Sequence, residues 1–428
     1  MVSYFKKILT EIFGRQTRKI LAKHDPTIIA VAGSVGKTTT KMAIATVLSQ
    51  SFRVRFQQGN YNTPISIPFV FTGREMPSLY NPFSWFWAWH KGQKTLRRKY
   101  PYDIVVVELG TDSPGDIANF KQLLHPKITV VTAVAEEHME FFKDLEAVAK
   151  EELGVADYSE QLVINADDIQ EEYLEKYVSK DVPMHSYGFK HAEYKITTSA
   201  SEEGYEVAIE LGGGQKVTTK TTSIAEHNLK AIAAAVAVGD LMGMEPDSIK
   251  KGINKIKAMP GRMQVLKGVR NSVIVDDTYN SSPIAVEAAL KTIYGIKAPQ
   301  RIAILGSMNE LGEYSKEAHT RVGNYCDSSK LDLIVTIGTQ ANEFLAPVVE
   351  ARGCKVVKTL SPYEAGKRVR DSIKPGAIIL AKGSQNGVFA EEALKLLLAN
   401  PGDVDKLVRQ NKFWLKKKSQ QFGDFPTS

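Results

Sequence analysis

The sequence predicts an α/β protein with a central P-loop domain built on a mostly parallel sheet, followed by a Rossmann-like α/β domain. Short apolar, β-branched runs alternate with helical stretches along most of the chain. A glycine-rich turn separates the first run from a helix, and the alternation resumes after a break at residues 259–262. This alternation is typical of parallel strands joined by crossover helices.

The glycine-rich turn follows the apolar run 27–32 and precedes a helical stretch at 41–50. Its residues are Gly33, Ser34, Val35, Gly36, Lys37, Thr38 and Thr39. A strand, a glycine turn and a helix start supply free N–H groups, a helix dipole, a lysine for phosphate charge and a hydroxyl for Mg²⁺. The first glycine of the full signature is replaced by Val31. We predict that the turn binds ATP or GTP, the alternative being a plain turn with a solvated lysine.

Length and composition indicate a globular protein of two main domains. The chain has 428 residues, 43% hydrophobic and 24% charged, and no apolar run reaches the roughly 18 residues that span a bilayer. Cys326 and Cys354 form no disulfide or zinc pattern, and the N-terminus lacks a signal peptide, so we expect a cytoplasmic protein. The mild net charge of +7 favours anionic partners in general, and we predict no nucleic-acid partner.

We expect four segments along the chain. Residues 1–25 form a basic amphipathic helix, which either packs on the next domain or lies on an anionic membrane surface. Residues 26–258 form the P-loop ATP-binding domain, with an antiparallel excursion near 194–222. Residues 259–400 form the Rossmann-like domain, and 401–428 form a basic tail with a terminal helix.

Two further strand ends carry groups suited to metal binding. Glu108 ends the run 105–107, at the edge where ligands gather in open α/β sheets, and is a candidate Mg²⁺ ligand. A carboxylate that caps the following turn is the alternative. His138 lies just past the next strand and is a second candidate, although a lone histidine is more often structural.

Taken in order, these motifs resemble those of the Mur ligases over about residues 26–400. The matching segments are 33–39, 59–64, 108–110, 114–117, 138–140, 148–150, 227–228, 260–262, 276–283 and 308–312. The downstream segments are most similar to the branch that adds D-alanyl-D-alanine to a UDP-muramoyl tripeptide. The resemblance implies that a carboxylate attacks the γ-phosphate of ATP, an acyl phosphate forms, and an amine displaces the phosphate.

The same resemblance implies a role for each metal-site residue. Lys37 would stabilise the transferring phosphoryl group, while Thr38 and Glu108 would hold one Mg²⁺. His138 and a carbamylated Lys150 would hold a second Mg²⁺. Carbamylation is needed because an ammonium has no lone pair, whereas its CO₂ adduct is an anionic oxygen ligand. Without the resemblance, Lys150 is a solvated helix residue.

The resemblance also assigns residues to the nucleotide and to the substrates. His227 and Asn228 would meet the adenine, and Arg262 and Asp277 would reach ATP; a helix cap and a turn carboxylate are the alternatives for Asn228 and Asp277. The substrate-facing candidates are Asn60, Asn62 and Thr63 for the carboxylate, and Tyr279, Asn280, Asn309 and Glu310 in the C-terminal part. Turn-forming asparagines are the alternative for the first group, and helix caps for residues 309–310.

Two features depart from the family pattern. Full-length members place a UDP-sugar domain before the phosphate loop, and residues 1–24 are too few to form one. Trp85, Trp87 and Trp89 lie close to the basic residues 97–99. Tryptophan with lysine and arginine suits a lipid–water interface, so we expect a lipid-linked or membrane-proximal substrate, or else a packed aromatic cluster.

We therefore predict an ATP- and Mg²⁺-dependent carboxylate–amine ligase that acts in peptidoglycan peptide assembly. Its partners would be a small-molecule or lipid-linked peptide and an amino acid or dipeptide amine, with peripheral membrane contact at the inner face. One alternative is an amide ligase for a peptide outside the cell wall. Another is a nucleotide-binding partner subunit without ligase activity of its own.

Overall fold

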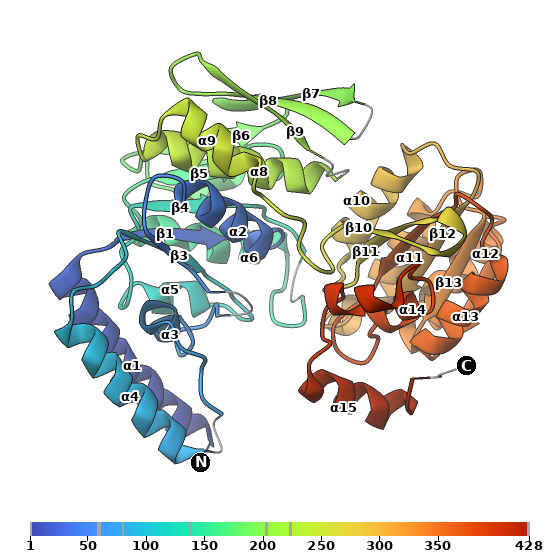
Figure 1. Ribbon diagram of the computed structural model, residues 1–428, viewed down its shortest axis with the longest axis horizontal. Coiled ribbons are helices and arrows are strands. Elements are labelled where there is room, and N and C mark those ends of the chain that lie inside the picture. The colour runs from blue at the N-terminus through green and yellow to red at the C-terminus, as the bar shows by residue number, and fades with distance from the viewer. Residues whose placement is uncertain are drawn as a thin grey trace. The chain divides into compact units, whose positions relative to one another are not determined.

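The computed structural model describes residues 2–57, 61–78, 81–136, 139–201, 204–221 and 225–425. The chain forms two compact units, each shown in Figure 1. The first comprises Met1–Ala135, Phe141–Thr222 and His227–Ile256; the second comprises Glu136–Glu140, Ser223–Glu226 and Lys257–Ser428. Each unit holds a sheet whose strands are mainly parallel, so the predicted α/β class is confirmed.

The first unit is built on a sheet of strand order β2-β3-β1-β4-β5-β6-β7-β8-β9. Its central strands are parallel and consist of buried β-branched residues, as in the run Ile104–Val107. The last three strands pair antiparallel, as expected for residues 194–222. The strands are β1 Thr27–Ala32, β2 Val54–Arg55, β3 Ile104–Glu108, β4 Ile128–Val131, β5 Leu162–Asn165, β6 Met184–Gly188, β7 Tyr194–Ser201, β8 Gly204–Glu210 and β9 Lys216–Thr221.

Strand β1 lies between β3 and β4, so the chain leaves it at the point where the strand order reverses. Ligands of open α/β sheets bind at this point, beyond the carboxyl ends of the strands. The helices of the unit are α1 Val2–His24, α2 Lys37–Leu48, α3 Ile67–Thr72, α4 Pro82–Arg97, α5 Asp116–Phe120, α6 Leu145–Leu153, η1 Gly154–Tyr158, α7 Glu171–Tyr177, α8 Glu226–Leu241 and α9 Pro246–Ile253.

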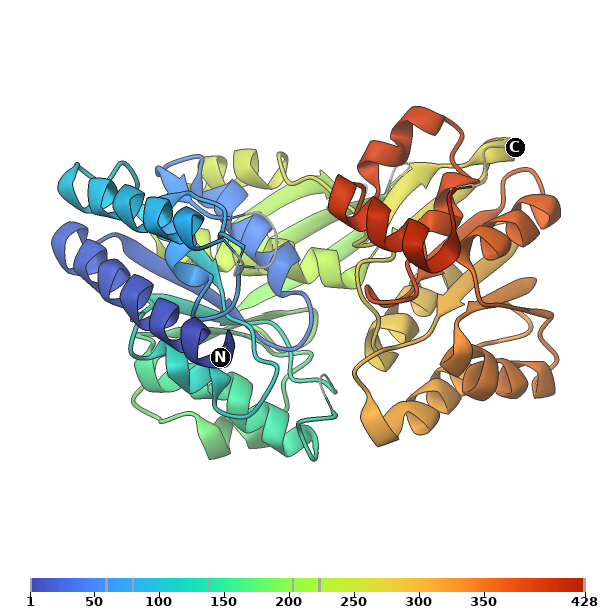
Figure 2. The same ribbon diagram turned by 90° about the horizontal axis from the view of Figure 1, so that it is seen from below.

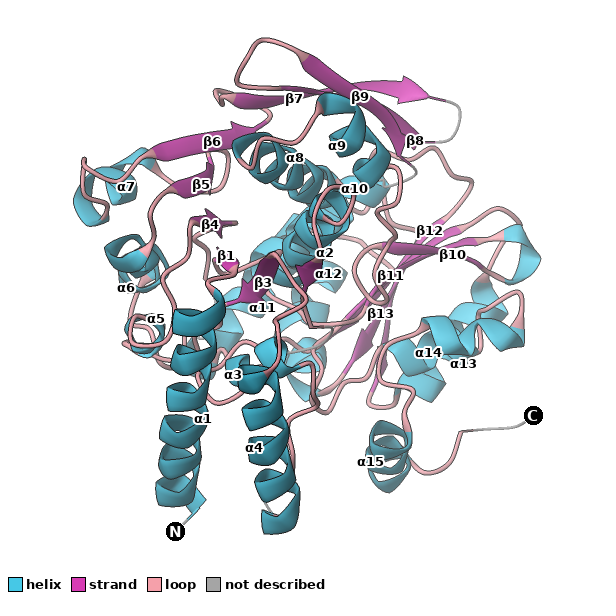
Figure 3. Ribbon diagram, turned by 60° about the vertical axis from the view of Figure 1, so that its left-hand side comes forward, coloured by secondary structure: helices cyan, strands magenta, loops and turns pink. Residues whose placement is uncertain are grey.

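Helices α1 and α4 lie side by side at one edge of the first unit (Figures 2 and 3). Their facing side chains form a small core with α3, which includes Leu9, Phe13, Phe69 and Trp85. The expected N-terminal amphipathic helix is therefore present and packs on its neighbours. Within the described part of the chain, no helix combines the length and apolarity needed to cross a bilayer.

The second unit has a sheet of order β10-β11-β15-β12-β13-β14, in which only the β10–β11 pairing is antiparallel. Its strands are β10 Gln264–Lys267, β11 Val273–Asp277, β12 Arg301–Gly306, β13 Leu333–Ile337, β14 Val356–Thr359 and β15 Ile378–Lys382. Its helices are η2 Val269–Asn271, α10 Pro283–Tyr294, η3 Gly312–Tyr314, α11 Ser315–Tyr325, η4 Ala341–Leu345, α12 Ala346–Ala351, α13 Pro362–Ser372, α14 Glu391–Lys395, η5 Pro401–Lys406 and α15 Lys412–Phe422.

Candidate nucleotide-binding and catalytic site

The phosphate loop is the turn between β1 and α2. Gly33 and Gly36 have φ angles of 115° and 88°, in the left-handed region that glycine tolerates. A Cβ on Gly33 would lie 2.4 Å from Thr132 Oγ1 and 2.8 Å from the amide nitrogen of Ala133, so no larger residue fits. Gly36 caps α2 without a side-chain hydrogen bond, which leaves the first N–H groups of the helix suited to an anion.

Lys37 and Ser34 fix the inside of this loop. Lys37 Nζ donates to the carbonyl oxygens of Gly33 (2.5 Å) and Ser34 (3.3 Å), which places its charge over the loop. Ser34 is buried, and its Oγ accepts from the amide nitrogen of Ala135 beyond β4 (3.0 Å). The loop is thus tied to the end of the neighbouring strand, as a preorganised phosphate cradle requires.

Glu108, at the end of β3, contacts the first turns of α2. Thr38 Oγ1 donates to Glu108 Oε1 (3.2 Å), and Lys41 Nζ lies 3.0 Å from Glu108 Oε2. A threonine hydroxyl and a carboxylate side by side are oxygen ligands of the kind that Mg²⁺ prefers, so this pair fits the metal implied by the sequence. Lys41 was missed in the sequence because a lysine one turn after Lys37 has the appearance of a solvated residue.

Helix α6 contributes a second residue that the sequence reasoning missed. Glu152 Oε2 accepts the amide N–H of Gly33 (2.7 Å), and its side chain is buried. Lys150 lies two residues earlier, in the last turn of the same helix, and is exposed. The helix therefore contacts the phosphate loop through Glu152, while the side chain of Lys150 is exposed.

The candidates of the substrate loop are described in part. Asn60 of this loop lies outside the described residues, as does His138, the candidate ligand of the second metal ion. Asn62 accepts the amide N–H of Gly110 at its backbone oxygen (2.8 Å), and its side chain packs where a Cβ on Gly110 would stand. Thr63 Oγ1 shares a hydrogen bond with Ser66 Oγ (2.9 Å). Asn62 and Thr63 thus shape a loop next to the end of β3, two residues beyond Glu108.

His227 and Asn228 lie in the first turn of α8. Asn228 Oδ1 is buried and has no hydrogen-bond partner among the residues that the structure describes. A buried acceptor without a donor is costly, which makes it a good partner for the amino group of a bound base. Asn228 therefore fits the adenine role that the resemblance implies.

In the second unit, Arg262 packs on the loop after β11. Its guanidinium carbon lies 4.0 Å from the centre of the Tyr279 ring, and its Nε is buried without a partner in the described chain. Asp277 accepts from Lys382 Nζ (2.7 Å) and from the amide nitrogen of Met263 (3.2 Å). Lys382 Nζ also donates to the carbonyl oxygen of Asn280 (2.9 Å). Asp277 thus joins β11 to β15 and to the segment of Arg262.

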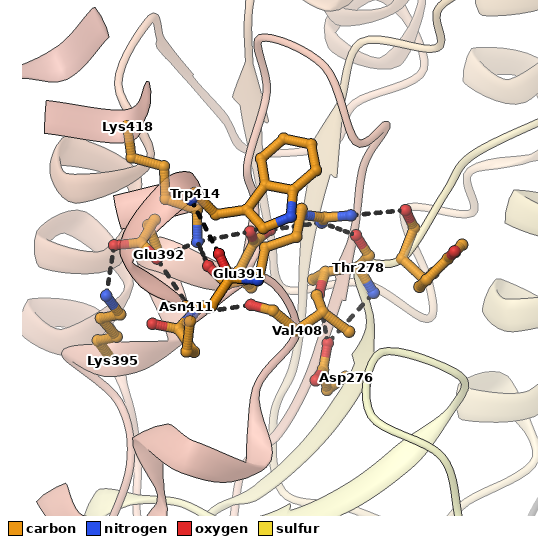
Figure 4. A network of polar contacts seen from close by, with 12 residues as sticks. Asp276, Thr278, Glu391, Glu392, Lys395, Val408, Asn411, Trp414 and Lys418 are labelled. Carbon is orange, nitrogen blue, oxygen red and sulfur yellow. Dashed lines mark hydrogen bonds and ion pairs between the residues drawn. The ribbon is translucent and has the colours of Figure 1, made fainter. Parts of the chain in front are cut away.

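A buried network of ion pairs and hydrogen bonds contacts the loop after β11, as Figure 4 shows. Arg409 donates to the carbonyl oxygens of Tyr279 (2.9 Å) and Thr278 (2.6 Å) and to both carboxylate oxygens of Glu391. Lys418, on α15, contacts Glu391 (2.9 Å) and Glu392 (2.6 Å). The sequence indicated only a basic tail here, because the partner acids lie on a separate helix.

The last candidates, Asn309 and Glu310, follow β12. The amide nitrogen of Asn309 donates to Ser384 Oγ (2.9 Å), and its side chain donates to the carbonyl oxygen of Asn386 (2.5 Å). Glu310 has a φ of 64°, an unusual value for a residue other than glycine. His319 accepts from the amide of Met308 (3.0 Å), and burial lowers its pKa, so a neutral imidazole holds this turn.

The chain matches two models of one enzyme family. The Mur ligase middle domain matches residues 90–239, and the Mur ligase glutamate ligase domain matches residues 261–385.

Curated relatives carry the name UDP-N-acetylmuramoyl-tripeptide–D-alanyl-D-alanine ligase. The protein from Bacillus subtilis is 27% identical over 380 residues, which cover 87% of this chain and 76% of the relative. The protein from Escherichia coli is 27% identical over 327 residues, which cover 74% of this chain and 65% of the relative. This chain thus spans about two thirds to three quarters of the length of these two relatives.

Solved structures share the fold. The MurF ligase from Thermotoga maritima in complex with ADP has a TM-score of 0.73 at 23% identity, covering 90% of this chain and 83% of its own. A MurF structure from Acinetobacter baumannii has a TM-score of 0.71 at 20% identity, covering 89% and 77%.

Proposed function

This chain belongs to the Mur ligase family, and from that premise we propose that it uses ATP to join a carboxylate to an amine through an acyl phosphate. The arrangement at the phosphate loop carries the proposal. The ammonium of Lys37, the hydroxyl of Thr38 and the buried carboxylate of Glu108 lie close together where β1 and β3 end. Phosphoryl transfer requires groups of these kinds, a cation for the phosphate and oxygen ligands for Mg²⁺.

Within this proposal, the loop residues 33–39 bind the phosphates of ATP. Their N–H groups and Lys37 stabilise the charge that spreads over the γ-phosphoryl group as it leaves ADP for the substrate carboxylate. Thr38 and Glu108 would hold one Mg²⁺, and His138 with a carbamylated Lys150 would hold a second. These ions would neutralise phosphate charge when bound. The exposure of Lys150 supports its carbamylation, because the amine must be reached by CO₂.

We assign His227 and Asn228 to the adenine, and Arg262 and Asp277 to further ATP contacts. Asn62, Thr63 and Asn60 are assigned to the carboxylate substrate. Tyr279, Asn280, Asn309 and Glu310 are assigned to the substrates in the second unit. The buried, unpartnered Oδ1 of Asn228 gives the strongest support among these residues, because an adenine amino group supplies the donor that it lacks.

For the substrates, we propose a UDP-muramoyl tripeptide and D-alanyl-D-alanine, since the names of the relatives state this pair. The enzyme would work in the cytoplasm, at the inner face of the membrane. A lipid-linked peptide is the second candidate for the carboxylate. Exposed aromatic side chains on α4 favour it, because they give the chain a surface suited to a lipid interface.

An acceptor screen tests the proposal. Purified chain, ATP and Mg²⁺ are mixed with UDP-muramoyl tripeptide, a lipid-linked peptide or a non-wall peptide, each with and without D-alanyl-D-alanine, and products are detected by mass spectrometry. We expect a product that gains one amide bond, with repeated turnover of ATP to ADP only when both substrates are present, because the carboxylate alone supports a single acyl-phosphate step. Lys37→Met should abolish it, whereas Lys216→Met, at an exposed site, should not. ATP binding without any ligated product would instead indicate the nucleotide-binding subunit.

A further inference from the structure

Helices α1 and α4 run parallel to each other. Gln16 Nε2 donates to the carbonyl oxygen of Trp89 (3.0 Å), and Lys23 Nζ donates to that of Leu96 (3.0 Å). Both contacts span the same sequence separation, so the two helices advance in the same direction. Their N-terminal halves therefore lie at the same end, which Figure 3 shows extending away from the sheet of the first unit.

The inner face of α4 is an ordinary packed core. Trp85 lies with its ring centre 5.4 Å from that of Phe13 and 5.8 Å from that of Phe69. Its indole nitrogen donates to the carbonyl oxygen of Ser78 (2.9 Å). From the sequence, a packed aromatic cluster was one of two alternatives for the tryptophans, and Trp85 lies in such a cluster.

The opposite face of α4 is different. Phe83, Phe86 and Trp87, which we call the aromatic face, are 78%, 60% and 59% exposed. At about 100° per residue, all three point well away from Trp85. The rings of Phe86 and Trp87 contact each other, with centres 6.1 Å apart. At the same end of the pair, α1 adds Phe5, Ile8 and Ile12, which are also exposed.

Basic side chains border the aromatic face. Lys91, Lys94 and Arg97 continue along α4 and are exposed, and the sequence of α4 contains no acidic residue. Lys6 and Lys7 of α1 are exposed at the end where the aromatic side chains gather. The one acid of α1, Glu11, is already bound to Arg15 and Arg18. The surface is therefore apolar at its tip and mainly positive around it, although Glu75 lines a hollow together with Arg74, Trp87 and Lys91.

We propose that the aromatic face inserts into the headgroup layer of an anionic lipid bilayer. Phenylalanine and tryptophan are stable where one side is apolar and the other is wet, and each nearby lysine or arginine gains from anionic headgroups. A negatively charged lipid surface complements the basic residues around the apolar tip. The inference goes beyond the ligase function, because such binding requires neither ATP nor a peptide substrate.

The test is sedimentation of the full chain with vesicles of phosphatidylcholine alone or mixed with phosphatidylglycerol. One variant carries Phe83→Ser, Phe86→Ser and Trp87→Ser, and another carries Lys91→Glu, Lys94→Glu and Arg97→Glu. Phe413→Ser is the matched control, because Phe413 is 68% exposed on a lysine-rich helix, α15, of the second unit. Trp85 remains in every variant, and near-UV dichroism, to which this buried side chain contributes, combined with thermal unfolding reports whether the α1–α4 pair still folds.

We expect wild type and Phe413→Ser to sediment with the anionic vesicles only, and both triple variants to lose at least about tenfold in affinity. High salt should weaken the wild-type binding. Equal binding of wild type and the aromatic variant would overturn the proposal, as would the absence of wild-type binding. A wild-type dimer that the aromatic variant abolishes would overturn it too, since a second copy would then cover the face. Product formation from soluble substrates should be unchanged in the aromatic variant, which separates this test from that of the ligase function.

Discussion

Lys41 Nζ lies 3.0 Å from Glu108 Oε2, and the two side chains are only 2% and 4% exposed. The pair joins the end of β3 to α2, the helix that follows the phosphate loop. A buried carboxylate without a countercharge would be strongly destabilising, so the ammonium of Lys41 offsets the cost of burying Glu108 at this place. The proposed metal ligand is thus held in position by a residue that need not touch the metal.

Lys41→Met should lower the free energy of unfolding of the first unit by about 3–5 kcal/mol, because it leaves the Glu108 charge buried and unpaired. Urea unfolding measures it, followed by tryptophan fluorescence, to which the buried Trp85 of the first unit contributes. Lys216→Met is the control, since its partner Glu210 is partly exposed and solvent-screened ion pairs contribute little to stability. Equal losses for the two variants would show that the Lys41–Glu108 pair is not buried as described.

Gly33→Ala should abolish ATP binding. The added methyl would overlap Thr132 Oγ1 and the backbone of Ala133, and the φ of 115° is strained for alanine, so the loop must move. Calorimetric titration with ATP and Mg²⁺ measures the effect. Gly213→Ala is the matched control, because no atom lies within 4 Å of its Cβ position. An unchanged ATP affinity in Gly33→Ala would contradict the assignment of the loop.

The sequence predicted the elements that depend on local patterns. The run Ile104–Val107 and the turn 33–39 were recognised because β-branched and glycine residues act on the backbone near them. Lys41, Glu152 and Arg409 were missed because their roles arise from partners more than a dozen residues away. In the sequence, a charged residue has the appearance of a solvated one until the fold supplies its partner.

The exposed and buried tryptophans illustrate the same limit. Trp85 and Trp87 lie two residues apart on one helix, yet one packs on Phe13 and the other faces solvent. The sequence allowed a packed cluster or an interfacial surface, and the structure contains a packed side and an exposed side. Helical geometry alone gives the angle between the two residues, whereas which of them is covered depends on where α1 lies.

Asp276 should make the stability of the second unit fall as the pH rises from about 4 to about 6. Burial raises its pKa to about 6, the charges of Glu391 and Asp277 act in the same direction, and the hydrogen bonds from Thr278 oppose them. The unfolded carboxyl titrates near pH 4, so the folded state holds the proton more tightly. The stabilisation is complete below about pH 4 and is lost as the pH passes about 6, a change of about 3 kcal/mol.

The measurement is urea unfolding of wild type and Asp276→Asn between pH 4 and pH 7. Asparagine keeps the acceptor for Thr278 and loses the bond from Gly261, so the variant is less stable throughout. The difference in unfolding free energy between the two proteins isolates the contribution of Asp276, and it should shrink as the pH rises. A difference that is constant with pH would contradict the raised pKa of Asp276.

Arg409→Lys should weaken ATP use although it keeps the charge. The guanidinium contacts both oxygens of Glu391 and the carbonyls of Thr278 and Tyr279, and a single ammonium cannot reproduce this fork. Arg262, a proposed ATP contact, packs on the ring of Tyr279. Losing the hydrogen bonds that hold the Tyr279 backbone should therefore displace Arg262 and raise KM for ATP about tenfold, while kcat changes less.

Arg53→Lys is the matched control for this substitution. Arg53 makes the same two-pronged contact with Asp103, but water screens this pair, so the loss of stability should be small and ATP use should not change. Steady-state kinetics at varied ATP, combined with thermal unfolding, separates the two outcomes. If Arg409→Lys lowers the melting temperature and leaves KM for ATP unchanged, the C-terminal network stabilises the second unit without positioning the Tyr279 loop for the nucleotide.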